Sequence, residues 1–100
     1  MTRGEAESIG SIIETMVTRL GIKKQLRRAQ VVTDWPVIVG ARIAKETRAE
    51  RIRNTSLFVT CSSPMWAQEL SLLTPTMIKK IRERVGPGIV TDIRFKTGPV

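Results

Sequence analysis

The amino-acid sequence predicts an α+β domain in which helices pack on one face of a three-stranded sheet. Apolar residues recur at helical spacing over the first 45 positions, residues 51–61 alternate with a period of two, and a further helical stretch and a further alternating stretch follow. The expected element order is helix, helix, strand, strand, helix, helix, strand. One hundred residues suffice for one hydrophobic core and are too few for two, so residues 1–100 are expected to form a single domain.

Two helices are expected before the first strand. The first carries a continuous apolar stripe over residues 9–20 and ends at Gly21 as its C-cap. The second carries basic residues on the outer side of its first turns, and its apolar set is Ile22, Leu26, Ala29, Val32 and Trp35. Because Pro36 cannot donate a backbone N–H and disfavours helical geometry at Trp35, the chain should bend there before a short helical piece over residues 37–45.

A β-hairpin is expected next. Residues 51–53 and 57–61 alternate with a period of two and include β-branched side chains. The sequence Asn54-Thr55-Ser56 between them favours a turn. The hairpin supplies the first two strands of the sheet.

Two short helices and a third strand complete the domain. Ser63-Pro64 and Thr74-Pro75 each combine an N-cap residue with a proline suited to the first helical position. These pairs predict two helices that meet at an angle, and one kinked helix is the alternative. Gly86-Pro87-Gly88 ends the second helix, and residues 89–96 alternate as a third strand.

Alternation divides the side chains of the sheet between two faces. The side chains expected to face the helices are those of Leu57, Val59, Cys61, Ile93 and Phe95. The opposite face is expected to carry Phe58, Thr60, Arg94 and Lys96. The sequence therefore predicts an open, basic sheet face with one aromatic side chain.

The chain is strongly basic. Seventeen Lys and Arg against nine Asp and Glu give a net charge of +8, and the isoelectric point is near 10.9. A charge of this size predicts a polyanionic partner. The alternative is that the charge only keeps a basic cytoplasmic protein in solution.

Composition excludes most enzyme chemistry. The sequence has no His, no Tyr and one Cys, so zinc clusters, haem ligation, Ser-His and Cys-His nucleophilic pairs and disulfide frameworks all lack their residues. Glu69 has neither a second carboxylate nor a metal-ligand spacing beside it. We therefore expect no catalytic site, no metal and no cofactor.

The N-terminus and the apolar runs indicate a cytoplasmic protein. No apolar run exceeds three or four residues, and Glu5 and Glu7 lie where a signal peptide carries only positive charge. We expect a soluble cytosolic protein without membrane contact, with Cys61 reduced and buried.

The candidate nucleic-acid-binding residues are grouped basic side chains. Four of them open the expected second helix, where the positive end of the helix dipole also attracts an anion, and the others flank the hairpin or lie on the third strand. They are Lys23, Lys24, Arg27 and Arg28 on the helix and Arg51, Arg53, Arg94 and Lys96 on the strands. For the helix group, the alternative is a solvated face without a ligand.

Three aromatic side chains are weighed as stacking platforms for bases. Phe58 is the candidate, because alternation turns it to the open face, and the alternative is that a partner chain covers it. Trp35 and Trp66 lie in register with apolar stripes and are expected to be core anchors.

Four segments of the sequence resemble the DciA family, and the similarity runs from about Ile9 to Phe95. They are Trp35-Pro36-Val37-Ile38-Val39-Gly40, Leu57-Phe58-Val59, Ser63-Pro64-Met65-Trp66-Ala67-Gln68-Glu69-Leu70 and Asp92-Ile93-Arg94-Phe95. The resemblance implies a KH-like domain of a bacterial protein that helps the replicative helicase DnaB onto DNA and itself contacts DNA. Members often carry a mostly disordered tail, whereas this chain ends at Val100, just past its last expected strand.

A KH domain commonly clamps phosphates with a GxxG loop between two helices. The corresponding junction here is Leu73-Thr74-Pro75-Thr76, which has no glycine and includes a proline without a backbone donor. Electrostatic contact with the nucleic-acid backbone is therefore the simpler expectation.

The sequence as a whole predicts a non-catalytic nucleic-acid-binding module that assists DNA replication. Two alternatives remain from other classes: a protein-interaction module that contacts an acidic partner such as the helicase, and an RNA-binding KH-like protein. The expected partners are single-stranded or duplex DNA, or RNA, with DnaB as the implied protein partner.

Overall fold

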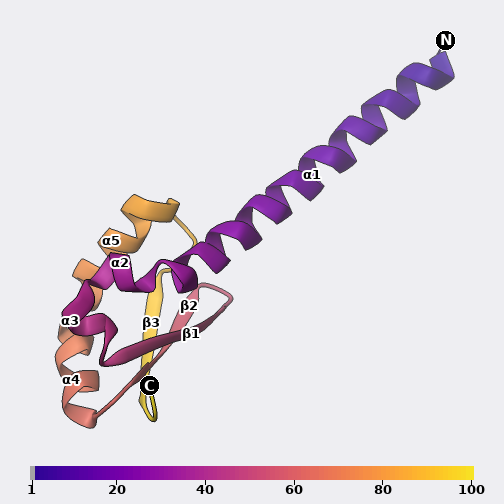
Figure 1. Ribbon diagram of the computed structural model, residues 1–100. Coiled ribbons are helices and arrows are strands. Elements are labelled where there is room, and N and C mark those ends of the chain that lie inside the picture. The colour runs from indigo at the N-terminus through magenta and orange to yellow at the C-terminus, as the bar shows by residue number, and fades with distance from the viewer. Residues whose placement is uncertain (1) are drawn as a thin grey trace.

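The computed structural model describes residues 2–100, with side chains described from residue 11 onwards. Its elements are α1 (Thr2–Thr33), α2 (Trp35–Val39), α3 (Ala41–Ala44), β1 (Thr47–Arg53), β2 (Ser56–Cys61), α4 (Pro64–Leu72), α5 (Thr74–Val85) and β3 (Asp92–Thr97). Helices lie over one face of a three-stranded sheet (Figure 1). The expected α+β class, with a KH-like arrangement of helices over a small sheet, is confirmed.

The sheet has the order β1-β2-β3, with β1 antiparallel to β2 and β2 parallel to β3. The expected hairpin is present, and a tight turn of Asn54 and Thr55 joins its strands. Asn54 has a φ of 57°, a left-handed conformation that asparagine tolerates better than most residues. β1 begins at Thr47, earlier than expected, because a bulge between Ala49 and Arg51 interrupts the alternation on which the prediction rested.

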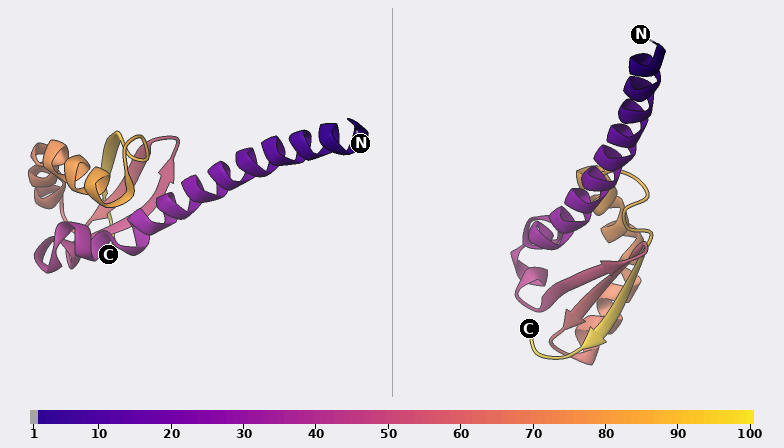
Figure 2. Two further views of the ribbon diagram at one scale, coloured as in Figure 1. Left: turned by 90° about the horizontal axis from the view of Figure 1, so that it is seen from above. Right: turned by 90° about the vertical axis from the view of Figure 1, so that its right-hand side faces the viewer.

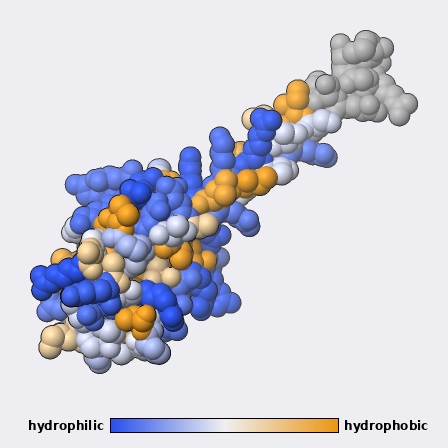
Figure 3. All heavy atoms as spheres, in the orientation of Figure 1, coloured by the Kyte–Doolittle hydropathy of each residue, from blue (hydrophilic) through white to orange (hydrophobic). Residues whose placement is uncertain are grey.

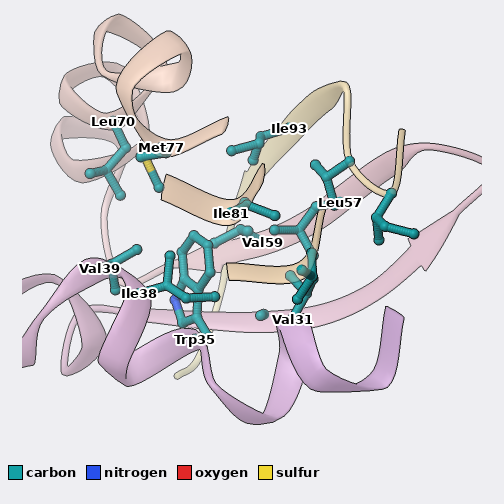
Figure 4. Packing of buried hydrophobic residues seen from close by; sticks show 14 of the residues in the cluster. Val31, Trp35, Ile38, Val39, Leu57, Val59, Leu70, Met77, Ile81 and Ile93 are labelled. Carbon is teal, nitrogen blue, oxygen red and sulfur yellow. The ribbon is translucent and has the colours of Figure 1, made fainter. Parts of the chain in front are cut away.

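The hydrophobic core lies between the sheet and the helices (Figure 4). The β2 side chains expected to face the helices are fully buried, and those of β3 are buried or partly buried against the same cluster. The helices contribute Val31, Trp35, Ile38, Val39, Leu70, Met77 and Ile81. In the right-hand view of Figure 2, α4 and α5 lie behind the sheet, and among residues 2–100 no helix covers its other face.

The two expected N-terminal helices are one continuous helix, α1, so the predicted end at Gly21 is wrong. Glycine inside a helix costs about 1 kcal/mol relative to alanine, but it ends the helix only when its backbone turns left-handed. Positive φ values occur at Gly40, Gly86 and Gly88, whereas Gly21 stays helical. The basic residues that follow it therefore continue α1.

Most of α1 projects away from the rest of the domain (Figures 1 and 2), and the molecule measures 66 × 23 × 19 Å. The predicted apolar stripe is present but not buried, because every residue from 11 to 27 is exposed. Apolar patches along the projecting helix are visible in Figure 3. The second apolar set is also misassigned to the core: Ile22, Leu26 and Ala29 are exposed, and Val31 is buried instead.

The chain turns after α1 at Asp34, and α2 starts with Trp35 and Pro36. The expected bend is present but lies one residue earlier than predicted, because proline is tolerated in the first turn of a helix. Gly40, with a φ of 87°, divides the expected helical piece over 37–45 into α2 and α3.

Trp35 is the core anchor that the sequence predicts. It is 2% exposed, and its indole Nε1 donates a hydrogen bond of 2.9 Å to Thr47 Oγ1. The Thr47 hydroxyl in turn donates to the Ile43 carbonyl at 2.8 Å. This chain of bonds satisfies the polar atom of a buried indole and joins α2, α3 and β1.

α4 and α5 are separate helices, which decides between the two alternatives for this region. Ser63 is the N-cap of α4, and its hydroxyl oxygen accepts a hydrogen bond of 3.3 Å from the Trp66 backbone N–H. Thr74 is not an N-cap: it is the first residue of α5, and its hydroxyl donates to the Leu70 carbonyl at 3.4 Å. That carbonyl lies in the last turn of α4 and also accepts the Leu73 backbone N–H at 3.0 Å.

Two details of the sheet differ from the alternation. Ile89 and Val90 are both buried, because they belong to the loop before β3 rather than to a strand. Thr60 lies on the face without helices yet is 2% exposed. Its hydroxyl donates to Glu50 Oε1 at 2.7 Å, and Gly98 lies against its methyl group.

Candidate nucleic-acid interface

The sheet face without helices carries the strand residues that are predicted to bind nucleic acid. Register places Arg51 opposite Phe58 and Phe58 opposite Arg94, so these side chains form one row across the three strands. Neighbouring strands are about 4.8 Å apart, so the row spans about 10 Å. Arg53 and Lys96 follow at two-residue spacing on the same face. We call Arg51, Arg53, Phe58, Arg94 and Lys96 the basic sheet face.

Phe58 lies beneath an arginine. The guanidinium carbon of Arg51 is 4.9 Å from the centroid of the Phe58 ring, which is a cation–π contact. The ring is partly buried, while Arg51 itself is exposed. The outermost group at the centre of the basic sheet face is therefore a guanidinium that lies over an aromatic ring.

Two carboxylates partly neutralise this face. Glu50 Oε1 accepts from Arg48 Nη2 at 2.9 Å and from Thr60 at 2.7 Å, and Asp92 Oδ2 accepts from Arg94 Nε at 3.2 Å. The hydrogen bonds from Thr60 and then Arg48 lower the pKa of Glu50 below its ordinary value of 4.5, so it is ionised at neutral pH. The basic sheet-face residues that pair with no carboxylate among the described side chains are Arg51, Arg53 and Lys96.

Sequence reasoning did not select Arg48 and Glu50 for this face. Both precede the expected start of the first strand, and the bulge at Ala49/Arg51 places Glu50 outside simple alternation. The available signal was the Arg-x-Glu spacing, which brings the two side chains to one side of a strand.

The helix group of predicted binding residues does not lie at a helix N-terminus. Lys23, Lys24 and Arg27 are exposed in the last third of α1, nearer the negative end of its dipole. The dipole argument for this group is therefore wrong. Arg27 instead reaches the loop after α5, where its Nη1 atom is 3.5 Å from the position that a Cβ on Gly86 would occupy.

Arg28 has a structural partner. Its Nη2 atom donates to the Asn54 carbonyl at 2.7 Å and to the Ile52 carbonyl at 3.3 Å. These two carbonyls flank Arg53 at the end of the hairpin, so Arg28 ties α1 to the sheet. Arg28 therefore lies between the helix group and the basic sheet face, and its Nη2 atom already donates to two backbone carbonyls.

A pocket of about 490 Å³ lies on the helix side of the domain, between α3 and α4. Trp66 forms part of its wall and is only partly buried, so the prediction that Trp66 is a core anchor is half right. Glu69 is an exposed residue of the same wall. The other lining residues are Arg42, Ile43, Met65, Leu70 and Leu73.

Two further groups from the sequence have structural roles. At the junction of α4 and α5, the Leu73 N–H donates to the Leu70 carbonyl at 3.0 Å, and Pro75 has no N–H to offer a phosphate. Cys61 is fully buried, and burial raises the pKa of its thiol, so it is a poor nucleophile.

In residues 2–100, no helix has the length and apolar character to cross a membrane.

Comparison with known proteins finds a family and several relatives. The family model described as Dna[CI] antecedent, DciA, matches residues 8–95. A UPF0232 protein of Corynebacterium glutamicum is 39% identical over 90 residues, which cover 90% of this chain and 51% of the relative. A UPF0232 protein of Streptomyces coelicolor is 36% identical over 89 residues, covering 87% and 47%. One from Mycobacterium leprae is 28% identical over 95 residues, covering 95% and 50%, so the chain spans about half the length of these relatives.

Proposed function

This chain belongs to the DciA family, and from that premise we propose that it is a non-catalytic DNA-binding domain that serves bacterial chromosome replication. We assign the DNA contact to the basic sheet face. The observation that carries this assignment is the row of Arg51, Phe58 and Arg94 across three adjacent strands. A net charge of +8 supports it, because neutralising phosphates supplies most of the affinity of such contacts.

The side chains of this face suit phosphates rather than base edges. Arg53 and Lys96 are exposed and have no carboxylate partner among the described residues. Phosphate contacts of this kind fix a strand on the protein without reading its sequence. The domain therefore binds DNA with little sequence preference.

Single-stranded DNA is the form that this face favours. The Arg51 guanidinium carbon lies 4.9 Å from the centroid of the Phe58 ring, and planar guanidinium groups stack on unpaired bases as aromatic rings do. Duplex DNA keeps its base faces stacked inside the helix, so it offers this pair no free base face to stack on. A single strand can use both the stacking surface and the flanking charges.

The family resemblance adds a protein partner, the replicative helicase DnaB, to which this domain would deliver or hold DNA. An observation on the opposite side of the molecule supports a protein contact of this kind. The pocket beside Trp66 is bordered by Met65, which is 74% exposed, and Leu73, which is 44% exposed. Exposed apolar side chains around a concavity are typical of protein-binding surfaces.

The test is a titration of the purified chain with end-labelled single-stranded DNA, duplex DNA and RNA at two salt concentrations, followed by fluorescence anisotropy. We expect the single strand to bind most tightly, and its affinity to fall with salt by about 0.7 in log-log slope for each phosphate neutralised. Affinity that does not change with salt contradicts an electrostatic contact. Tighter binding of RNA than of DNA of the same sequence would move the function to RNA.

A further inference from the structure

We propose that two copies of this chain pair through their α1 helices, side by side and antiparallel. The stripe residues that the structure describes are all more than half exposed: Ile12 57%, Ile13 58%, Met16 56%, Val17 65% and Leu20 64%. Their helical spacing puts them on one side of α1, which projects beyond the domain, and Figure 3 shows apolar patches along this helix. Contiguous apolar surface of this kind marks an interface that is covered in solution.

The projecting helix needs a partner for its own stability. Residues 11–26 are exposed and none of them belongs to the hydrophobic core, so core packing does not stabilise this stretch of α1. Helices in water take most of their stability from packing an amphipathic face, and propensity alone is marginal. Gly21 lowers that propensity by about 1 kcal/mol. A second α1 laid on the stripe supplies the missing packing.

The stripe is complementary to itself in one antiparallel register. Pairing residues whose numbers add up to 29 sets Ile13 opposite Met16 and Ile12 opposite Val17. The same register sets Ile9 opposite Leu20 by position. Each position of the stripe is thereby set opposite another position of the stripe, as in the apolar seam of a coiled coil.

The charges along α1 select this antiparallel arrangement. The register sets Glu5 opposite Lys24, which are opposite charges at the two ends of the seam. A parallel pair would set Lys23, Lys24 and Arg27 against their own copies. It would also bring together the two remaining parts, residues 34–100, each with eleven Lys and Arg against six Asp and Glu. The antiparallel pair holds the two domains at opposite ends of the seam and leaves both basic sheet faces accessible.

The first test measures mass in solution by light scattering and sedimentation over a range of concentrations. We expect a species of twice the 11.2 kDa of one chain at high concentration. The double substitution Ile13→Glu with Met16→Glu should leave only monomer. The matched control is Ile22→Glu: Ile22 is 53% exposed but lies two and a half turns from Ile13, on the opposite side of α1, and its substitution should leave the dimer intact.

The second test determines the direction of the pair. Glu5→Lys alone and Lys24→Glu alone should each weaken the dimer several-fold, and the chain with both substitutions should recover it, because the two charges exchange places. A chain that is monomeric at every concentration overturns the proposal. Loss of the dimer with Ile22→Glu, or a double charge exchange that fails to recover it, overturns the stripe and the antiparallel register respectively.

Discussion

The guanidinium carbon of Arg51 lies 4.9 Å from the centroid of the Phe58 ring, on the strand pair where β1 and β2 place these residues opposite each other. The contact places a planar cation over an aromatic ring, on a sheet face whose other basic side chains are exposed. Flatness matters because a nucleic-acid base stacks on a plane and gains little from a solvated lysine. The pair therefore gives the basic sheet face a fixed centre.

Replacing Phe58 with leucine should weaken binding of single-stranded DNA selectively. Leucine keeps apolar bulk on β2 but removes the ring that supports Arg51. We expect a loss of about 5-fold or more for the single strand, since stacking contributes about 1–3 kcal/mol per base, and a small change for duplex DNA. Anisotropy titrations of parent and variant at one salt concentration check this. Equal losses for both DNA forms would mean that Phe58 acts only through folding.

Replacing Arg28 with alanine should lower stability more than it lowers DNA affinity. The substitution removes two hydrogen bonds from a cation to the Asn54 and Ile52 carbonyls, with an expected cost of about 1–2 kcal/mol. The control is Lys23→Ala, an exposed change on the same helix that should stay within about 0.5 kcal/mol. Urea unfolding gives both values. An unchanged urea midpoint with strongly reduced affinity would make Arg28 a phosphate contact.

The two tryptophans should differ in their cost to stability. Trp35→Ala removes a side chain that is 2% exposed together with its bond to Thr47, and should cost about 3–5 kcal/mol. Trp66→Ala removes a partly buried wall of the pocket and should cost about 1–3 kcal/mol. Thermal and urea unfolding of both variants measure the difference. If Trp66→Ala lowers the free energy of unfolding more than Trp35→Ala does, Trp66 and not Trp35 is the main anchor of the core.

Glu50 should make folding stability depend on pH in the acid range. Because hydrogen bonds from Thr60 and Arg48 lower its pKa in the folded state, the folded state binds the proton less tightly than the unfolded chain does. This contribution is present above the ordinary value of 4.5 and is lost as pH falls through the lowered value. The fall in Tm between pH 7 and pH 3 should be smaller for Glu50→Gln, and also for Thr60→Val, which removes the first donor. Parent-like pH dependence in both variants contradicts the assignment.

Much of the fold follows from local sequence patterns. The hairpin, the Ser63 cap, the separation of the last two helices and the alternation of β2 all depend on contacts within a few residues, which spacing and capping rules describe directly. The sequence places Arg51, Phe58 and Arg94 on the correct strands, but their alignment in one row depends on strand register. Register between β2 and β3 is set by packing across a long connection and has no local signal.

The errors come from competition between local rules and the rest of the structure. Gly21 has the position of a C-cap, yet the helix continues because no left-handed turn is needed there. The apolar stripe before it has the periodicity of a core helix. Periodicity cannot distinguish an apolar face that the same chain buries from one that is exposed in the single chain. The bulge at Ala49/Arg51 likewise puts Arg48 and Glu50 on a face that alternation counted back from Arg51 does not predict.

The basic sheet face as the DNA-binding surface is tested most directly by two matched charge reversals. Arg51→Glu with Lys96→Glu, and Lys79→Glu with Lys80→Glu on the exposed side of α5, each lower the net charge from +8 to +4. With both variants shown to be folded by circular dichroism, affinity for single-stranded DNA is measured at one ionic strength. The sheet-face variant should lose about tenfold or more, and the helix variant only a small part of that. Equal losses, or a larger loss from the α5 variant, would contradict the basic sheet face as the site of DNA binding.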